Sequence, residues 1–461
     1  MTDAQRSAQP APPGTVTPTP PRRAMIAAIA GAFLEWYDFT LFGIAAGLIF
    51  PALFFPNSSP TTAVIESFGA FAAGFVMRPV GAVVFGHFGD RIGRRRMLLI
   101  TVTIIGGGTF LIGLIPSYDS IGLAAPALLI GLRLVQGFGL GGEFGGGALI
   151  ALENAPVGRR GLMGSVHQMG TPLGLLVATG AFSLVQLLPP PALNSWGWRI
   201  PFLLSALFLL VAMYIRRALP ETETFQAEAA KAQRLPITAL FRHHPKNILL
   251  AIGIRMADAV TFNVINVFAI SFATRQLGLG RQVMLTGFLI ASAVEVAIIP
   301  LIGALSDRIG RRPVYSFGIV LCGIMAFAYF PALATGNTYL AWLVIVVTLA
   351  VGTGCMFSLQ GAVFAEMFST HTRYTGIGVA YQTSALIGGA PTPAIATALA
   401  AAFGMSYLPV SIYMASICAI SLVCMLLAKE TFRDSLIQQP VTGLAPTLAA
   451  DLGINPSQRT D

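Results

Sequence analysis

The stretches "GHFGDRIGRR" (residues 86–95) and "GALSDRIGRR" (residues 303–312) end in the same six residues. Asp90 and Asp307 occupy the same position in the two copies, and each copy follows the second of six long apolar runs. A charged hexapeptide that recurs at the same place in both parts of a chain indicates an internal repeat. We therefore expect two similar halves, each built from six segments.

Composition indicates that lipid, not water, surrounds these segments. Of 461 residues, 55% are hydrophobic and only 10% are charged, whereas a soluble protein carries about 25% charged residues. Runs of about 20 apolar residues, long enough to cross a bilayer, occur about twelve times. Backbone groups in lipid must be satisfied within their own segment, which predicts an all-helical membrane protein. The expected runs lie near residues 24–50, 63–88, 97–116, 124–151, 162–188, 198–219, 247–273, 283–305, 314–333, 339–365, 375–402 and 407–428.

The basic residues predict the orientation of the chain. They gather in every second connection between runs, and the intervening connections hold only Arg275 and Arg281. The positive-inside rule then places both termini in the cytoplasm. The net charge of +9 is thus a signal of topology, and we expect no binding of nucleic acid. The grouped cations are Arg91, Arg94, Arg95 and Arg96; Arg159 and Arg160; Arg216, Arg217, Lys231, Arg234, Arg242 and Lys246; Arg308, Arg311 and Arg312; Arg373; and Lys429 and Arg433.

Five segments follow from this pattern. We expect a disordered cytoplasmic tail at 1–23, a six-helix bundle at 24–219, a cytoplasmic connector at 220–246, a second bundle at 247–429 and a cytoplasmic tail at 430–461. The first run is too long for a cleaved signal peptide and contains Glu35 and Asp38. Four scattered cysteines lack the spacing of a disulfide or metal site. The histidines form no nucleophile–base pattern, so we expect neither an enzyme nor a bound cofactor.

The repeated D-R-x-G-R-R segment resembles the signature of the major facilitator superfamily. Within it, five further segments resemble the metabolite:proton symporter family, which includes shikimate, α-ketoglutarate, citrate and proline/betaine permeases. The resemblance covers about residues 25–430, and "QGAVFAEMF" (360–368) and "RYTGIGVAYQ" (373–382) are most similar to shikimate permeases. The five segments are "FLEWYDF" (33–39), "GFVMRPVG" (74–81), "QGFGLGGEFGG" (136–146), "WGWRIPF" (196–202) and "LPETETF" (219–225).

This resemblance implies a function and two alternatives. It implies a functional monomer in the bacterial inner membrane that imports a small organic anion with protons. A proton symporter of zwitterions such as proline or betaine is one alternative, although the C-terminal tail has no heptad pattern. A proton-coupled exporter is another, but "GTPLG" (170–174) departs from the G-P-x-x-G-G pattern of such antiporters.

Charged residues inside the spans are candidates for proton coupling, because a charge at mid-membrane is costly. Glu35 and Asp38 are three residues apart and lie on one helix face. Arg133 resembles the fourth-helix arginine that the superfamily uses in coupling, and we expect it to pair with Asp38 or Glu35. Glu143 lies about 15 Å further along that helix, so another helix must supply its partner. A permanent structural ion pair is the alternative for each of these groups.

A second group of residues could bind substrate. Arg78 and Arg255 could each hold a carboxylate, although Arg78 could equally serve coupling and Arg255 could be neutralised by Asp258 three residues later. Gln136, Tyr37 and Tyr381 could line the cavity, or simply pack. Glu295 is another acid within a span, and His167 is expected to be a helix-contact residue.

The resemblance implies that the repeated motif is a gate, which braces the state closed toward the cytoplasm. We expect its aspartate to accept hydrogen bonds from the amides that start the next helix and to pair with an arginine. Its glycines allow a tight turn, and its arginines face anionic lipid. The gate residues are Gly86, Asp90, Arg91, Gly93, Arg94 and Arg95 in the first half, and Asp307, Arg308, Gly310 and Arg311 in the second.

The stretch "RLVQGFGLGGEFGGG" (133–147) contains a G-x-G-x-x-G spacing. A dinucleotide-binding turn would require a preceding strand, and this stretch lies inside an apolar span. The pairs Gly137/Gly141, Gly141/Gly145 and Gly142/Gly146 are each four apart, which favours a smooth helix ridge for close packing.

Overall fold

The computed structural model describes residues 21–153, 155–156, 158–217, 244–369 and 372–432, with side chains undescribed at 21–24, 60–61, 90–92, 94 and 281. Twelve of its helical segments are long and apolar enough to cross a membrane, as predicted. The predicted connector at 220–246 and the two tails lie largely outside the described residues. Helix α1 begins at Pro21, three residues before the predicted start.

Two sets of six spans follow one another along the chain. The first set consists of α1 (Pro21–Leu48), α3 (Pro60–Ile92), α4 (Arg94–Leu114), α6 (Ala124–Glu153), α7 (Arg160–Gln168) with α8 (Gly170–Val185), and α9 (Pro190–Ala192) with η2 (Leu193–Gly197) and α10 (Arg199–Arg217). The second set consists of α13 (Pro245–Asn263) with η3 (Val264–Phe268) and α14 (Ala269–Arg275), α15 (Arg281–Ile309), α16 (Arg311–Ala334), α17 (Thr338–Val346) with η4 (Val347–Thr353), α18 (Gly354–Phe357) and α19 (Gln360–Met367), α20 (Arg373–Ser384) with η5 (Ala385–Gly389) and α21 (Thr392–Ala402), and α22 (Leu408–Leu427). Short helices α2 (Phe50–Phe54) and α5 (Tyr118–Ile121) join spans at the face opposite the termini.

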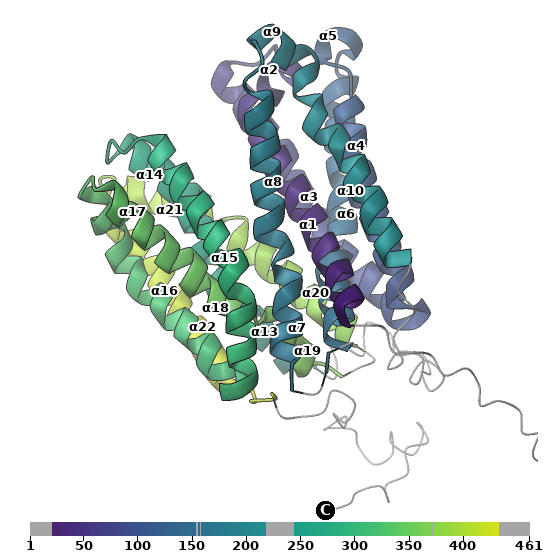
Figure 1. Cartoon of the computed structure of the whole chain (residues 1–461). Coiled ribbons are helices and arrows are strands. Elements are labelled where there is room, and N and C mark those ends of the chain that lie inside the picture. The colour runs from purple at the N-terminus through teal and green to yellow at the C-terminus, as the bar shows by residue number, and fades with distance from the viewer. Residues whose placement is uncertain (1–20, 154, 157, 218–243, 370–371, 433–461) are drawn as a thin grey trace, which may run out of the picture.

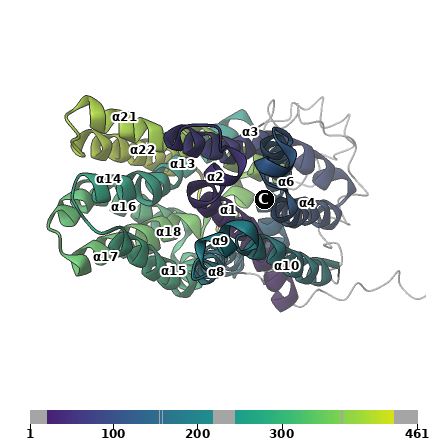
Figure 2. The same cartoon turned by 90° about the horizontal axis from the view of Figure 1, so that it is seen from above.

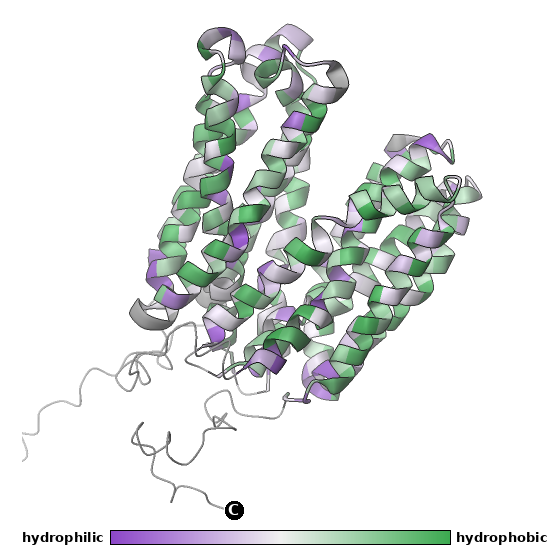
Figure 3. Cartoon of the chain, turned by 180° about the vertical axis from the view of Figure 1, so that it is seen from behind, coloured by the Kyte–Doolittle hydropathy of each residue, from purple (hydrophilic) through white to green (hydrophobic). Residues whose placement is uncertain are grey.

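Interruptions divide several spans, and apolar periodicity did not predict them. Met169 separates α7 from α8, and π-helical turns interrupt the sixth, seventh, tenth and eleventh spans. Apolar side chains cover the outer surface, as a lipid solvent requires: Leu301 is 67% exposed and Leu210 is 65% exposed. Figure 3 shows apolar residues along the helices, with hydrophilic residues gathered mainly at helix ends and at a few points between them.

The glycines of α6 allow close packing, but they do not form one ridge. A Cβ at Gly137 would lie 1.9 Å from a backbone oxygen of α3, and one at Gly141 would lie 2.2 Å from another. On a second face, a Cβ at Gly139 would lie 2.7 Å from Ile104 of α4. The glycine-rich sequence therefore packs α6 against two neighbours of its own bundle, and its later glycines meet the second bundle.

The two bundles approach each other at one end and diverge at the other (Figure 1), and Figure 2 shows them side by side from above. We call the end where α1 begins and α22 ends the terminal face. Near it, α20 packs against α3 and α6, α15 packs against α7 and α8, and α19 packs against α6 and α7. The structure is therefore closed between the halves at the terminal face.

Candidate functional site

The centre of the first bundle holds a fully buried polar network around Asp38. Arg133 Nη1 lies 2.7 Å from Asp38 Oδ2, and Gln136 Nε2 and Thr109 Oγ1 donate to Asp38 Oδ1 at 2.8 and 2.7 Å. The Arg133 guanidinium also covers the ring of Phe42, at 3.9 Å from its centroid. The predicted pairing of Arg133 with Asp38 is confirmed, and every helix that surrounds the pair contributes to holding it.

Glu35, one turn earlier on α1, has a much looser environment. Its Oε1 lies 3.7 Å from Arg78 Nη1 of α3. Glu35 and Arg78 keep 6% and 8% of their surface exposed, whereas Asp38 keeps none. Arg78 also lies over the ring of Phe75, at 4.5 Å. Of the two carboxylates on this helix, Glu35 is the one that is loosely paired and keeps some exposed surface.

Glu143 finds its partner in Arg216, near the end of α10. Both side chains are buried, and the carboxylate and guanidinium make a close two-pronged pair. Thr101 Oγ1 donates to Glu143 at 2.9 Å, and Arg216 also donates to the Leu98 oxygen at 2.8 Å. A Cβ at Gly31 would collide with both charged groups, so this glycine provides the space for the pair.

Arg216 was grouped by sequence with the cytoplasmic cations, but its side chain belongs to the buried interior. Glu143 is fixed by three hydrogen bonds with no exposed surface, which favours the structural reading over a place in the proton path. Gln136 is likewise fully buried beside Asp38, so it does not line a substrate cavity.

The second bundle presents its own charged cluster on α13. Gln360 of α19 lies between the two charges: it accepts from Arg255 Nε at 3.3 Å and donates to Asp258 Oδ2 at 2.8 Å. Arg255 Nη1 further donates to Ser384 Oγ at 3.0 Å. The structure records no ion pair within 4.0 Å between Arg255 and Asp258, so Arg255 is not neutralised directly by the acid three residues later. Sequence reasoning missed Gln360, because an amide inside a helix carries no distinguishing pattern.

An aromatic stack joins this cluster to the first bundle. The Tyr381 ring stacks on Phe144 of α6 with centroids 3.6 Å apart and planes at 16°. The guanidinium of Arg255 lies 3.6 Å from the same Tyr381 centroid, and therefore covers the other face of the ring. Tyr381 thus lies at the junction between the halves. Tyr37 does not: its hydroxyl donates to the Pro201 oxygen at 2.6 Å inside the first bundle, and the predicted cavity-lining role is wrong for it.

Two further titratable residues lie within spans. Glu295 is half-buried on α15, and the structure records no hydrogen bond or ion pair for it among the described residues. His167 is buried and lies 2.9 Å from the Ala28 oxygen, as expected for a helix-contact histidine. Within the described part of the chain, no group of three or more histidine, cysteine, aspartate or glutamate residues could hold a metal ion.

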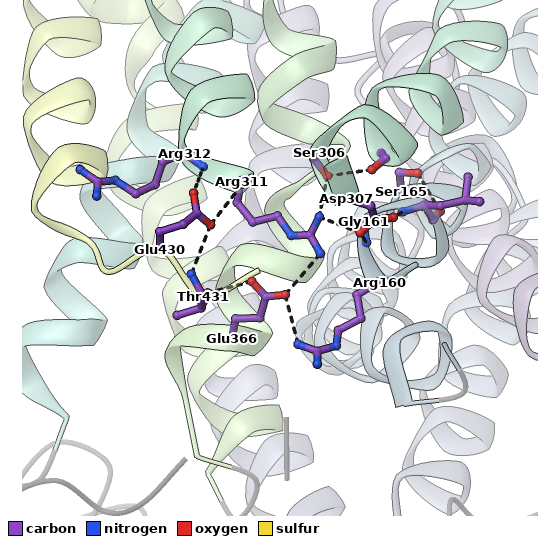
Figure 4. A network of polar contacts seen from close by, with 12 residues as sticks. Arg160, Gly161, Ser165, Ser306, Asp307, Arg311, Arg312, Glu366, Glu430 and Thr431 are labelled. Carbon is purple, nitrogen blue, oxygen red and sulfur yellow. Dashed lines mark hydrogen bonds and ion pairs between the residues drawn. The ribbon is translucent and has the colours of Figure 1, made fainter. Parts of the chain in front are cut away.

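The gate motif of the second half joins the two bundles at the terminal face (Figure 4). Asp307 accepts from the amides of Gly161 and Leu162 at 2.7 and 2.9 Å. These amides begin α7, in the other half. Arg311 pairs with Asp307 at 2.8 Å, as predicted, while Arg308 is exposed.

The amides that start α16 have a different acceptor, which corrects the prediction that Asp307 would receive them. Glu430, just beyond α22, accepts from the amides of Arg311 and Arg312 at 3.2 and 2.8 Å. Thr431 donates to Glu366 at 2.8 Å, and Glu366 lies 3.5 Å from both Arg311 and Arg160. Sequence reasoning missed Glu366 and Glu430, because neither belongs to the repeated motif.

The first copy of the motif is only partly described. The side chains of Asp90, Arg91 and Arg94 lie outside the described residues. Gly93 and Gly310 have φ angles of 115° and 103°, which confirms the two tight turns. A Cβ at Gly86 would lie 2.6 Å from the backbone of Thr375 in α20, so this glycine serves close approach. Arg95 Nη2 donates to the Arg217 oxygen at 2.5 Å.

The site therefore consists of two charged groups that face each other across the halves. Glu35 and Arg78 belong to the first bundle, and Arg255 and Tyr381 belong to the second. The two groups are neighbours, because a Cβ at Gly378, three residues before Tyr381, would lie 3.4 Å from Ala82, four residues after Arg78. Neither guanidinium is tightly paired: Glu35 lies 3.7 Å from Arg78, and Asp258 reaches Arg255 only through Gln360.

Comparison with known proteins identifies the family to which the chain belongs. Residues 23–239 match the family described as "Sugar (and other) transporter", and residues 250–452 match "Major Facilitator Superfamily". The shikimate transporter of Escherichia coli K12 is 39% identical over 427 residues, which cover 91% of this chain and 97% of that protein. A glycine betaine/proline/ectoine/pipecolic acid transporter, OusA of Dickeya dadantii, is 34% identical and covers 94% and 86%.

A solved structure shares the fold. The proton:xylose symporter XylE, from E. coli, has a TM-score of 0.72 at 16% identity and covers 90% of this chain and 98% of its own. Two bundles of six spans, a repeated gate motif and relatives matched over nearly their whole length lead to one conclusion. The chain belongs to the major facilitator superfamily, and within it to the metabolite:proton symporter family, as a multi-pass membrane transporter and not an enzyme.

Proposed function

We propose that the protein is a secondary active transporter of the bacterial inner membrane that imports a small organic acid together with protons. The observation that carries this proposal is the junction between the bundles, where the Glu35–Arg78 pair of the first bundle lies beside Arg255 and Tyr381 of the second. Guanidinium groups that are only loosely paired suit a carboxylate substrate, because each can bind it through two parallel hydrogen bonds.

The terminal face is the cytoplasmic side in this proposal. The described cations gather there, whereas Arg199 and Arg275 lie toward the opposite face. The closed contacts at the terminal face then correspond to a state that receives substrate from outside. Arg199 is an exception that the sequence analysis overlooked, and its donation to backbone oxygens of Gly113 and Ile115 accounts for its position.

Charge balance explains how proton and anion would move together. With Glu35 ionised, Arg78 is already neutralised by it at 3.7 Å. At an effective dielectric constant of about 20, charges near 4 Å attract by on the order of 4 kcal/mol, so the carboxylate competes with a substrate anion. A proton on Glu35 releases Arg78 to the substrate, and the net charge of the site stays constant when both are bound. By reciprocity, the anion favours the proton as much as the proton favours the anion.

Asp38 has a different part in this scheme. Its carboxylate is held by Arg133, Gln136 and Thr109 at 2.7–2.8 Å with no exposed surface. A proton could reach it only after the network separates. We therefore assign first proton binding to Glu35, and we keep the Asp38–Arg133 pair as a candidate for the step in which the bundles rearrange.

The relatives support two classes of substrate. Shikimate is the substrate named for the E. coli relative at 39% identity, and a hydroxylated ring acid would use an arginine for its carboxylate and Tyr381 for its ring. Transporters of betaine and proline are also related, at 31–34% identity. Glu295, the half-buried acid of α15, is the feature that would favour them, since an ammonium group needs a carboxylate nearby.

Uptake into proteoliposomes tests the proposal. Purified protein is exposed to labelled shikimate, α-ketoglutarate, citrate, proline and betaine under an imposed inward proton gradient. The proposal expects an organic acid to accumulate above its external concentration, and expects this to stop when a protonophore is added. Accumulation of proline or betaine without any acid would overturn it in favour of a zwitterion carrier. Acid that leaves against an opposite proton flux would identify an exporter.

A further inference from the structure

Tyr374, the second residue of α20, lies inside the opposite bundle. Its hydroxyl donates to the Gly142 oxygen of α6 at 2.7 Å, and the residue is 1% exposed. It begins a helix of the second half, yet glycines of α3 and α6 in the first half lie against its ring. The Tyr374 side chain therefore belongs to the second bundle and is inserted into the first.

Glycines form the space that receives this ring. A Cβ at Gly89 of α3 would lie 2.2 Å from Tyr374 Cδ1 and Cε1. On α6, a Cβ at Gly145 would lie 2.9 Å from Tyr374 Cδ2, and one at Gly146 would lie 2.7 Å from the hydroxyl oxygen. Real Cβ atoms do not approach that closely. We call Gly89, Gly145 and Gly146 the glycine socket. Any side chain at these positions would compete with the ring for the same volume.

The equivalent crossing on the other side of the molecule is built differently. There α7 begins with Arg160-Gly161, where α20 begins with Arg373-Tyr374. A Cβ at Gly161 would lie 2.3 Å from Ser306 Oγ of α15. In that crossing both helices carry a glycine, because a Cβ at Gly303 of α15 would lie 2.5 Å from the Gly161 oxygen, whereas at Tyr374 the incoming helix carries a ring in place of the glycine. The inserted ring is therefore a departure from the internal repeat and not a consequence of it.

The position of the socket defines what the ring blocks. A Cβ at Gly141 of α6 would lie 2.2 Å from the oxygen of Arg78, and Gly145 lies four residues beyond Gly141, about 6 Å closer to the terminal face at 1.5 Å per residue. Tyr381, which stacks on Phe144, lies two helical turns further from that face along α20. The socket thus lies between the charged junction and the cytoplasmic side.

We propose that Tyr374 is the gate residue of the cytoplasmic side, and that its ring must leave the glycine socket before the protein can open inward. The ring and its hydrogen bond stabilise the closed state, and Gly145 and Gly146 of α6 provide the space that the ring occupies. This inference concerns the conformational step alone. It holds for any substrate and any coupling ion, so it can fail while the proposed function stands, and the reverse also applies.

Thiol labelling tests it without a substrate. Ala148 of α6 is fully buried, close to Gly361 of the other half. In a background with the four native cysteines replaced by alanine, Ala148→Cys reports opening at this face to an impermeable maleimide in inside-out vesicles. We expect Gly89→Ala to raise the labelling rate at least fivefold. Gly131→Ala is the matched control, because its Cβ would meet nothing within 4 Å, and it should change the rate less than twofold.

Removal of the ring completes the test. Tyr374→Ala should itself raise the labelling rate. Adding Gly89→Ala to this variant should change the rate less than twofold, because the new methyl group has no ring to displace. Tyr374→Phe keeps the ring and loses only the hydroxyl bond, which predicts a rise of about fivefold, as one hydrogen bond is worth about 1 kcal/mol. If Gly89→Ala prevents folding, recovery of folded protein by the added Tyr374→Ala supports the same conclusion. Equal labelling in Gly89→Ala and Gly131→Ala, or full additivity in the double variant, would overturn it.

Discussion

Replacing either member of the Glu143–Arg216 pair should destabilise the protein strongly, while replacing both should not. Glu143 is 0% exposed and Arg216 is 1% exposed, so Glu143→Met leaves a guanidinium buried without its counter-charge. Breaking a buried ion pair in this way costs about 3–5 kcal/mol. We expect a loss of that size for Glu143→Met and for Arg216→Met.

The double variant distinguishes the pair from its surroundings. Two methionines fill a similar volume without charge, and buried pairs replaced by apolar residues are often as stable as the original. We expect Glu143→Met/Arg216→Met to lie within about 2 kcal/mol of the wild type, which gives a coupling energy of several kcal/mol in the double-mutant cycle. Unfolding in mixed micelles by added SDS, followed by tryptophan fluorescence, measures all four proteins under one condition.

Transport by the double variant decides between the structural and the proton-coupling reading of Glu143. If the pair is structural, the reconstituted double variant accumulates substrate to the same ratio as the wild type. A double variant that is stable and exchanges substrate, but no longer accumulates it along a proton gradient, would refute the reasoning. Single variants that each cost less than about 1 kcal/mol would refute it as well.

Three further outcomes follow from the contacts. Asp307→Asn weakens two hydrogen bonds to helix amides and one ion pair. Maleimide labelling of the Ala148→Cys thiol should therefore rise about tenfold, since a hydrogen bond to a charged group is worth about 1.5–3 kcal/mol. Gly141→Ala places a Cβ 2.2 Å from a backbone oxygen of α3 and should cost about 3 kcal/mol in the micelle unfolding assay, whereas Gly131→Ala should stay within about 0.5 kcal/mol. Arg255→Lys loses the planar stack on Tyr381 and one arm of the fork, so KM for the transported acid should rise about tenfold with little change in maximal rate.

The sequence predicted the fold well, because lipid imposes simple rules. Twelve apolar runs, the alternation of basic connections and one repeated hexapeptide are enough to define two six-helix halves. The interruptions near Met169 and within the π-helical turns escaped prediction, since their residues are as apolar as their neighbours. What distinguishes them is packing, which periodicity does not encode.

The site was predictable where a charge had to find an opposite charge. Arg133 pairs with Asp38, as expected, and Glu143 pairs with a residue of another helix. The identity of that partner depended on where α10 ends, because two adjacent arginines at a helix end can point inward or outward. Gln360 and Glu430 could not be foreseen, since uncharged amides and residues beyond the last span carry no sequence signal of their contacts.

Proton flux that accompanies substrate entry tests the central claim most directly. Proteoliposomes with a trapped pH-sensitive dye receive the transported acid, and lumen pH is recorded together with uptake of label. The account predicts that the lumen acidifies in a fixed ratio to uptake by the wild type. Glu35→Gln should still exchange internal for external substrate but should carry no protons. Uptake by the wild type without acidification, or undiminished proton flux in Glu35→Gln, would contradict the account.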